Sequence, residues 1–295
     1  MSGSSNFSGL WIPLITPFVV DAVDHPNLTR LVKHYAAAGV KGFVACGSTG
    51  EAAAQDKTEQ LAVLDTVLEA AAGLPVLMGL SGYHLGQTVA WVQELAKRPI
   101  AGLLVPAPHY IRPAQAGLVH WFTALADASA KPLVIYDIPY RTGATITVET
   151  LLKLAAHSNI QAIKDCGGDA GKTQALIADG RLQVLAGEDA QVFTTLALGG
   201  AGAITASAHV CTAQFVEVIR LVQQSDLQKA RAMWQTLVPV VNAVFAEPNP
   251  AVIKAVLADR GQIRDGLRLP METASAAATQ RLLAAIAKVA KAAVQ

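Results

Sequence analysis

Residues 102–139 read GLLVPAPHYIRPAQAGLVHWFTALADASAKPLVIYDIP and contain one complete unit of the dominant pattern of the chain. Two short apolar runs, residues 102–107 and 132–139, enclose a stretch in which Leu118, Phe122 and Leu125 recur at helical spacing. The runs are continuously apolar rather than alternating, which is typical of parallel strands buried on both faces. This stretch therefore predicts a strand, a helix and a second strand parallel to the first.

The same alternation extends in both directions from this stretch. Further buried strands are predicted at residues 10–18, 42–47, 75–81, 160–166, 182–186 and 202–207. Eight strands, each followed by a helix, predict a closed (β/α)8 TIM barrel of the α/β class, with an open doubly wound sheet as the alternative. After Cys211 the patterns are helical, at residues 214–223, 226–245, 250–260 and 274–294. We expect a catalytic barrel over residues 1–225 and a helical C-terminal region over residues 226–295.

Composition argues against several classes of protein. Of the 295 residues, 52% are hydrophobic and 15% are charged, and the formal net charge is +1. These values do not fit a disordered chain, and they provide no basic surface for nucleic acid or anionic lipid. The three cysteines form no CxxC pair, and neither a signal peptide nor a membrane span is evident. We therefore expect a cytoplasmic protein that binds neither nucleic acid nor membrane.

Lys164 is the first candidate for chemistry. It closes the apolar run at residues 160–166, and the active sites of barrels lie at the carboxyl ends of the strands. Burial of a lysine favours the neutral amine, which is the form that attacks a carbonyl carbon. The alternatives are a side chain that extends out to solvent or one that pairs with Asp165.

Two other strand ends carry polar groups. Tyr136 lies in the run at residues 132–139, where it is either a proton donor and acceptor or a core aromatic residue. Arg141 follows on the loop, and its guanidinium suits a substrate carboxylate or a surface ion pair. After the run at residues 42–47, Ser48 and Thr49 lie between glycines and form either an anion-binding nest or a plain tight turn. We interpret Glu51 as a favourable charge in the first turn of the helix that follows.

Metal-dependent chemistry finds little support. The seven histidines form no HxH or HExxH pair, and neither a GxSxG motif nor a Walker loop is present. The acidic pair at residues 188–189 is expected to cap the next helix rather than to form a carboxylate site.

Five short motifs occur over nearly the whole chain. They are Gly-Ser-Thr-Gly-Glu at 47–51, Tyr-Asp-Ile-Pro-Tyr-Arg-Thr-Gly at 136–143, Ile-Lys-Asp at 163–165, Glu-Pro-Asn-Pro at 247–250 and Leu-Arg-Leu-Pro-Met at 267–271. In order and spacing this set resembles the dihydrodipicolinate synthase and N-acetylneuraminate lyase family of pyruvate-dependent class I aldolases. The resemblance implies a lyase that needs no metal or other cofactor, because an iminium formed with a lysine is itself the electron sink.

The resemblance also implies roles for particular residues. Lys164 is expected to form a Schiff base with pyruvate, and Tyr136 to act as acid and base. Ser48 and Tyr110 are expected to complete the proton relay. In the family Tyr110 would reach in from a neighbouring subunit of a homotetramer built as a pair of dimers.

Substrate contacts follow from the same resemblance. Ser48 and Thr49 are expected to hold the pyruvate carboxylate, and the backbone at Gly187 and Ile204 to form the remaining wall of the pyruvate site. Arg141 would hold the carboxylate of L-aspartate 4-semialdehyde, which favours the branch that makes 4-hydroxy-tetrahydrodipicolinate for lysine and diaminopimelate biosynthesis.

The chain also departs from the family pattern. Ser48 replaces a threonine, Asp137 an asparagine and Tyr140 a small residue, and these departures bear on the second substrate. A relative that acts on a sugar acid through the same imine, and a catalytically silent paralogue, are therefore kept as alternatives. Weak or absent inhibition by lysine is expected, because few of the aligned effector positions match; these are Ala52, Lys57, Gln60, His84, Thr88 and His109.

Overall fold

A computed structural model describes residues 5–292 of the chain. Within these residues, eight strands form a closed parallel barrel in the order β1-β10-β9-β8-β7-β6-β5-β4. The predicted barrel is confirmed, and the open sheet is not formed. The described residues fall into two compact units: unit 1 holds residues 5–9 and Pro75–Ile204, and unit 2 holds Leu10–Leu74 and residues 205–292. The predicted division at residue 225 stays a prediction.

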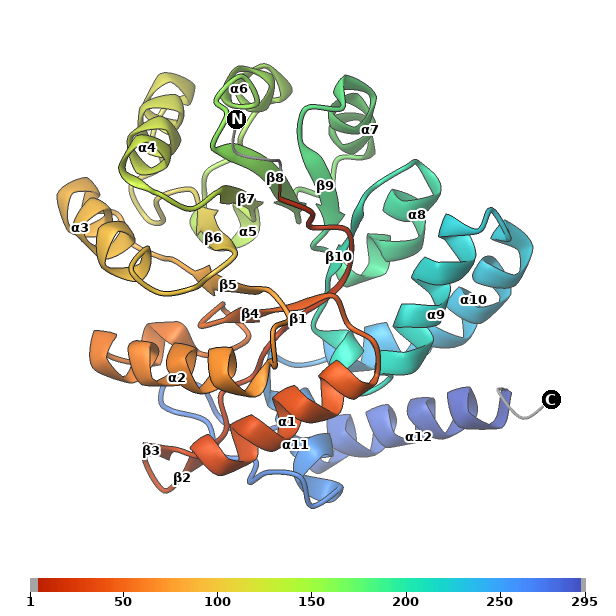
Figure 1. The fold of residues 1–295 in the computed structure, drawn as a ribbon. Coiled ribbons are helices and arrows are strands. Elements are labelled where there is room, and N and C mark those ends of the chain that lie inside the picture. Colours follow the sequence, from red (N-terminus) through yellow and green to blue (C-terminus); the bar gives the residue numbers. More distant parts are fainter. Residues whose placement is uncertain (1–4, 293–295) are drawn as a thin grey trace. The chain divides into compact units, whose positions relative to one another are not determined.

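Unit 1 contains the middle of the chain (Figure 1). Its strands are β5 (Val76–Gly79), β6 (Gly102–Pro106), β7 (Leu133–Asp137), β8 (Ile160–Asp165), β9 (Gln183–Ala186) and β10 (Gly202–Ile204). Its helices are α3 (Leu85–Leu95), α4 (Gln115–Ala128), α5 (Pro139–Thr142), α6 (Val148–Leu154), α7 (Ala170–Asp179), the short 3-10 helix η2 (Asp189–Gln191) and α8 (Val192–Ala197). Figure 1 shows α4, α6 and α7 outside the arc of strands β6 to β9.

The β6-α4-β7 segment shows why the sequence folds in this way. Helix α4 buries Leu118, Phe122 and Leu125 on one face, as their spacing predicts. Every residue of β7 is buried, as expected for a strand covered on both faces. Parallel pairing places Tyr136 beside Lys164 of β8, so the register of the sheet aligns these two candidate residues.

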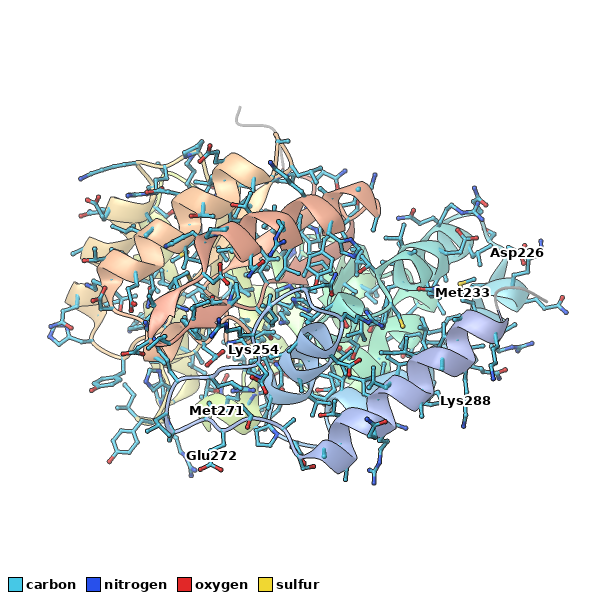
Figure 2. The ribbon with its side chains drawn as sticks, turned by 90° about the horizontal axis from the view of Figure 1, so that it is seen from below. Asp226, Met233, Lys254, Met271, Glu272 and Lys288 are labelled. Carbon is cyan, nitrogen blue, oxygen red and sulfur yellow. The ribbon has the colours of Figure 1, made fainter. Side chains whose placement is uncertain are left out.

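Unit 2 contains the remaining elements. Its strands are β1 (Gly9–Pro13), β2 (Phe18–Val19), β3 (Ala22–Val23) and β4 (Gly42–Ala45). Its helices are α1 (His25–Ala37), η1 (Ala52–Ala54), α2 (Lys57–Ala70), η3 (Ser207–His209), α9 (Thr212–Gln223), α10 (Leu227–Val244), α11 (Ala251–Asp259) and α12 (Ala276–Ala292). The four helices predicted after Cys211 are confirmed over the described residues, and α12 contacts α10 and α11. Residues 293 and 294, at the end of the last predicted helix, lie outside the described residues. Figure 2 shows Lys254 on α11 among packed side chains, whereas Lys288 projects outward from α12.

The first predicted strand is shorter than expected. Residues 10–18 were predicted as one strand, but β1 ends at Pro13 and a separate antiparallel hairpin, β2-β3, begins at Phe18. Pro13 and Pro17 have no N–H to donate, so the parallel ladder ends between them. Val20, in the turn of the hairpin, has a φ of 59° and is 96% exposed.

Candidate active site

Lys164 and Tyr136 lie together at the carboxyl ends of β8 and β7. The Lys164 side chain is buried, at 5% exposure, and Tyr136 is 8% exposed. The Nζ of Lys164 lies 4.4 Å from the centre of the Tyr136 ring. The amine therefore lies over the face of the Tyr136 ring, and the two side chains are neighbours at the strand ends where the active sites of barrels lie.

Asp165 does not form an ion pair with the Lys164 amine. Its Oδ1 accepts a hydrogen bond from the backbone N–H of Gly167 at 2.9 Å, and its Oδ2 accepts one from the Thr173 hydroxyl at 2.5 Å. Successive residues of a strand face opposite sides of the sheet, so Lys164 and Asp165 point apart. The alternative in which Lys164 pairs with Asp165 is therefore wrong.

Gly187 lies against the Lys164 stem, just after β9. A Cβ at this position would lie 2.5 Å from Cγ of Lys164 and 2.6 Å from Sγ of Cys166, closer than non-bonded carbon and sulfur atoms approach. Only glycine leaves room for the lysine here. Cys166, two residues beyond Lys164, shares its face of β8, and burial raises the pKa of its thiol to about 12. The thiol is therefore neutral at ordinary pH and fills space beside the lysine.

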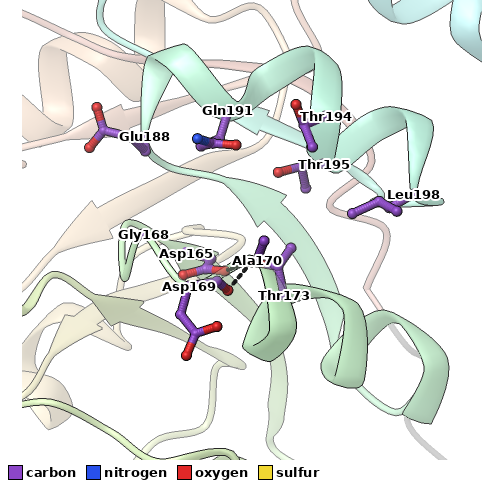
Figure 3. Close-up of a pocket in the computed structure, with 10 residues that line it drawn as sticks. All are labelled: Asp165, Gly168, Asp169, Ala170, Thr173, Glu188, Gln191, Thr194, Thr195 and Leu198. Carbon is purple, nitrogen blue, oxygen red and sulfur yellow. Dashed lines mark hydrogen bonds between the residues drawn. The ribbon is translucent and has the colours of Figure 1, made fainter.

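An acidic pocket lies on the outer side of these strand ends (Figure 3). Asp165, Asp169 and Thr173 line it from the side of α7, and Glu188, Gln191, Thr194, Thr195 and Leu198 from the side of η2 and α8. Burial raises the pKa of Glu188, with a further rise from Asp189 and an opposing effect of Lys164. Glu188 occupies the position before η2 but makes no side-chain capping bond, so the expected capping role is wrong for this residue.

Asp137 and Lys172 form a buried ion pair between β7 and α7. Their side chains are 0% and 4% exposed, and the Lys172 ammonium donates to Oδ2 of Asp137. A Cβ at Gly167 would collide with this ammonium, so the loop after β8 must carry glycine there. Burial raises the pKa of Asp137, while Lys172 opposes the rise.

Ser48 and Thr49 lie together in unit 2, on the loop that follows β4. Thr49 is 3% exposed, and its Oγ1 accepts a 2.9 Å hydrogen bond from Nδ2 of Asn249. The Gly50 N–H donates to Gly47 O at 3.0 Å, which closes a tight turn around the two hydroxyl residues. A Cβ at Gly50 would lie 2.8 Å from Leu14 O, so the turn packs against backbone.

Glu51 has a different role from the one expected. It adopts a left-handed conformation, with a φ of 56°, one residue before η1, and it is 6% exposed. Its carboxylate accepts from the Lys254 ammonium and, at 3.2 Å, from the backbone N–H of Arg268. The interpretation as a first-turn helix charge is wrong, because the side chain anchors the loop to the C-terminal region of unit 2.

The other predicted residues of unit 1 differ in exposure. Tyr110 lies on the loop after β6 with a φ of 73° and is 86% exposed. Arg141 is exposed on α5, with its guanidinium 6.0 Å from the centre of the Tyr140 ring, and has no ion-pair partner within residues 5–292. The surface ion pair considered for Arg141 is thus not formed there. Ile204 is fully buried at the end of β10.

The Dihydrodipicolinate synthetase family model matches residues 6–289. The chain belongs to this family. It is 36% identical to 4-hydroxy-tetrahydrodipicolinate synthase 2 of Clostridium acetobutylicum, over 89% of this chain and 93% of that one. It is also 36% identical to 4-hydroxy-tetrahydrodipicolinate synthase of Sorangium cellulosum, over 95% of each chain. The crystal structure of dihydrodipicolinate synthase from Acinetobacter baumannii complexed with pyruvate matches with a TM-score of 0.93 and 28% identity, covering 97% of this chain and 99% of that one.

Three features of this dihydrodipicolinate synthetase family member were not predicted from its sequence. Cys166 had a usable signal, because its position two residues beyond Lys164 places it on the same face of the strand. The contacts of Lys172 and Asn249 had no local signal, because their partners, Asp137 and Thr49, lie 35 and 200 positions away. Asn249 itself was noted only as part of the Glu-Pro-Asn-Pro motif.

No group of three or more His, Cys, Asp or Glu side chains within residues 5–292 is arranged to hold a metal ion. In the same part of the chain, no helix has both the length and the hydrophobicity to cross a membrane.

Proposed function

We propose that the protein is a 4-hydroxy-tetrahydrodipicolinate synthase, which condenses pyruvate with L-aspartate 4-semialdehyde through a Schiff base on Lys164. The observation that carries the proposal is the buried Lys164 amine, 4.4 Å from the centre of the Tyr136 ring, in a chain of the dihydrodipicolinate synthetase family. The names of the relatives at 36% identity support the same reaction.

The proposed reaction begins with attack of the Lys164 amine on the keto carbon of pyruvate. The carbonyl oxygen leaves as water, after Tyr136 has supplied a proton, and a protonated imine remains. Loss of a proton from the pyruvate methyl group gives an enamine, whose carbon attacks the aldehyde carbon of the second substrate. The aldehyde oxygen takes up a proton, and the amine of the semialdehyde then displaces Lys164 as the ring closes.

Binding of pyruvate is assigned to the two loops that follow β4 and β9. Ser48 and Thr49 would hold the carboxylate through hydroxyl and backbone N–H groups. The backbone at Gly187 and Ile204 would form the remaining wall of the pyruvate site. The tight turn at Gly47–Gly50 and the close approach of Gly187 to Lys164 support this assignment.

Arg141 is assigned to the carboxylate of the semialdehyde. Its guanidinium is exposed on α5 and has no ion-pair partner within the described residues, so it is available to a substrate. Tyr136 is the penultimate residue of β7 and α5 begins at Pro139, and this short separation along the chain supports a role for Arg141 at the mouth of the same site.

We further propose a cytoplasmic homotetramer in which Tyr110 completes the relay of Tyr136 and Ser48 in a neighbouring subunit. The Tyr110 side chain is 86% exposed, and the adjacent Ile111 is 52% exposed. Tyr83, whose ring centre lies 5.3 Å from that of His109, is 56% exposed. Exposed apolar side chains of this kind are typical of surfaces that associate.

Borohydride trapping tests the proposal directly. Reduction in the presence of pyruvate is expected to add to Lys164 the mass of one pyruvic acid less one oxygen atom, as read by intact-mass and peptide analysis. Lys164→Ala should show no adduct, and Lys131→Ala, at a surface lysine, should react as the wild type does.

The second substrate is tested by an aldehyde panel. With pyruvate present, Arg141→Ala should lose turnover of L-aspartate 4-semialdehyde while still forming the trapped adduct. Turnover of sugar-acid aldehydes in preference to the semialdehyde would favour the alternative branch of the family, and absence of any adduct in the wild type would favour a silent paralogue.

A further inference from the structure

Two motifs that marked the family have contacts to the loop of Ser48 and Thr49. Asn249, from Glu-Pro-Asn-Pro at 247–250, donates from Nδ2 to Oγ1 of Thr49 at 2.9 Å. Arg268, from Leu-Arg-Leu-Pro-Met at 267–271, donates its backbone N–H to Glu51 at 3.2 Å. All these residues belong to unit 2, and about 200 positions of sequence separate the partners.

The contact at Thr49 determines what its hydroxyl can do. A threonine hydroxyl has one hydrogen to donate, and its oxygen accepts. Because the oxygen of Thr49 already accepts from the Asn249 amide, its hydrogen is turned away from Asn249 and stays available to an acceptor such as a carboxylate. The amide thus sets the direction in which Thr49 donates.

A buried charge cluster holds the other end of the loop. Glu51 is 6% exposed and Lys254 is 0% exposed, and the Lys254 ammonium also donates to Gly266 O at 2.9 Å. The Arg268 guanidinium binds Glu59 at 2.7 Å and Ala54 O at 2.8 Å. Buried charges that are paired and hydrogen-bonded resist displacement, since breaking one contact leaves the other charge uncompensated. The loop is therefore fastened at Thr49 and again at Glu51.

We propose that Asn249 is a positioning residue for pyruvate binding, which orients the Thr49 hydroxyl as a donor to the substrate carboxylate. The inference rests on the proposed function, because it requires Thr49 to bind that carboxylate. It assigns a part in substrate binding to the segment between α10 and α11, which lies outside the barrel strands.

The test measures the half-saturating pyruvate concentration for borohydride trapping in three single variants. Asn249→Ala is expected to raise this concentration about tenfold. This factor corresponds to the loss of one hydrogen bond, from the Thr49 hydroxyl to the charged carboxylate of pyruvate. Asn249→Asp, of the same shape, is expected to raise it further, because a carboxylate accepts the Thr49 hydrogen and repels the substrate. Asn242→Ala, at an exposed position of α10, is the matched control and should leave it unchanged.

A double variant separates positioning from general damage. In a Thr49→Val background, adding Asn249→Ala should have no further effect, because the hydroxyl that Asn249 orients is already gone. Equal pyruvate saturation in Asn249→Ala and Asn242→Ala would overturn the inference, and so would an undiminished Asn249→Ala effect in the Thr49→Val background. If Asn249→Ala does not fold, the half-saturating pyruvate concentration of Asn249→Asp is compared with that of Asn242→Ala instead, and equal values would overturn the inference. Failure of the wild type to form any pyruvate adduct would instead overturn the proposed function.

Discussion

At the scale of single residues, the site depends on how closely Lys164 is enclosed. The Tyr136 ring lies on one side of the amine, and Gly187 and Cys166 lie against its stem. The enclosure excludes water from the amine and limits the positions it can take. An amine confined in this way presents itself to an incoming group in one orientation.

His209 provides a residue-scale prediction for stability. Its imidazole is buried. The Nε2 atom accepts a hydrogen bond from the Ile15 N–H at 3.2 Å, and Nδ1 donates to Ala206 O at 2.8 Å. Burial lowers the pKa of His209 from 6.5 to about 4. Between pH 6.5 and pH 4 the unfolded chain binds a proton at this residue that the folded chain does not. The contribution of His209 to the free energy of unfolding is therefore fully present above pH 6.5. It falls by about 3 kcal/mol as the pH drops toward 4.

The measurement is urea unfolding of the wild type and of His209→Gln between pH 7.5 and pH 4. The variant should lose the His209 part of the pH dependence, and His120→Gln, at an exposed position of α4, should retain it. Parallel pH profiles for the wild type and His209→Gln would contradict the prediction.

At the scale of elements, the Asp137–Lys172 pair joins β7 to α7 across the loop that follows β8. Asp169 also caps α7 by accepting from the Lys172 N–H at 3.1 Å, so the first turn of α7 is held to the sheet by both backbone and side chain. Lys164 is the penultimate residue of β8, just before this loop. The pair therefore supports the site without touching a substrate.

Lys172→Met is expected to destabilise the protein by about 3–5 kcal/mol, because it leaves Asp137 buried without its cation. Asp137→Asn combined with Lys172→Met should regain most of that loss, since neither buried charge remains. Urea unfolding of the single and double variants measures both effects, and Lys153→Met, in the last turn of α6, serves as the control. A double variant no more stable than Lys172→Met would contradict the prediction.

At the scale of the whole molecule, the decisive question is whether one chain completes its own site. Tyr110 is 86% exposed on the loop after β6, and a phenol so placed can enter a neighbouring subunit. If Tyr110 of one subunit acts in the site of its neighbour, two different inactive variants can form an active site when they assemble together.

Co-expression of Tyr110→Phe chains with Lys164→Arg chains tests this. If Tyr110 acts across the interface, random pairing should restore up to about a quarter of the wild-type sites, those that combine an intact Lys164 with the partner's intact tyrosine. Activity no greater than the sum of the two separately expressed variants would contradict a role in a neighbouring subunit.

The sequence alone determined the barrel, because local periodicity governs which segments become buried strands and which become helices. The eight strand runs and the spacing of Leu118, Phe122 and Leu125 were sufficient for this. Position at a strand end was also enough to single out Lys164 and Tyr136, since their registers align in a parallel sheet.

Contacts between distant segments were decided only by the tertiary structure. Nothing in the spacing of Asn249 and Thr49, of Lys254 and Glu51, or of Lys172 and Asp137 indicates that they meet. Whether a charge or hydroxyl is buried and paired depends on packing over the whole chain, whereas the sequence carries only local pattern. For the same reason Glu51 was predicted as a helix-end charge and proved to be the buried anchor of the loop that follows β4.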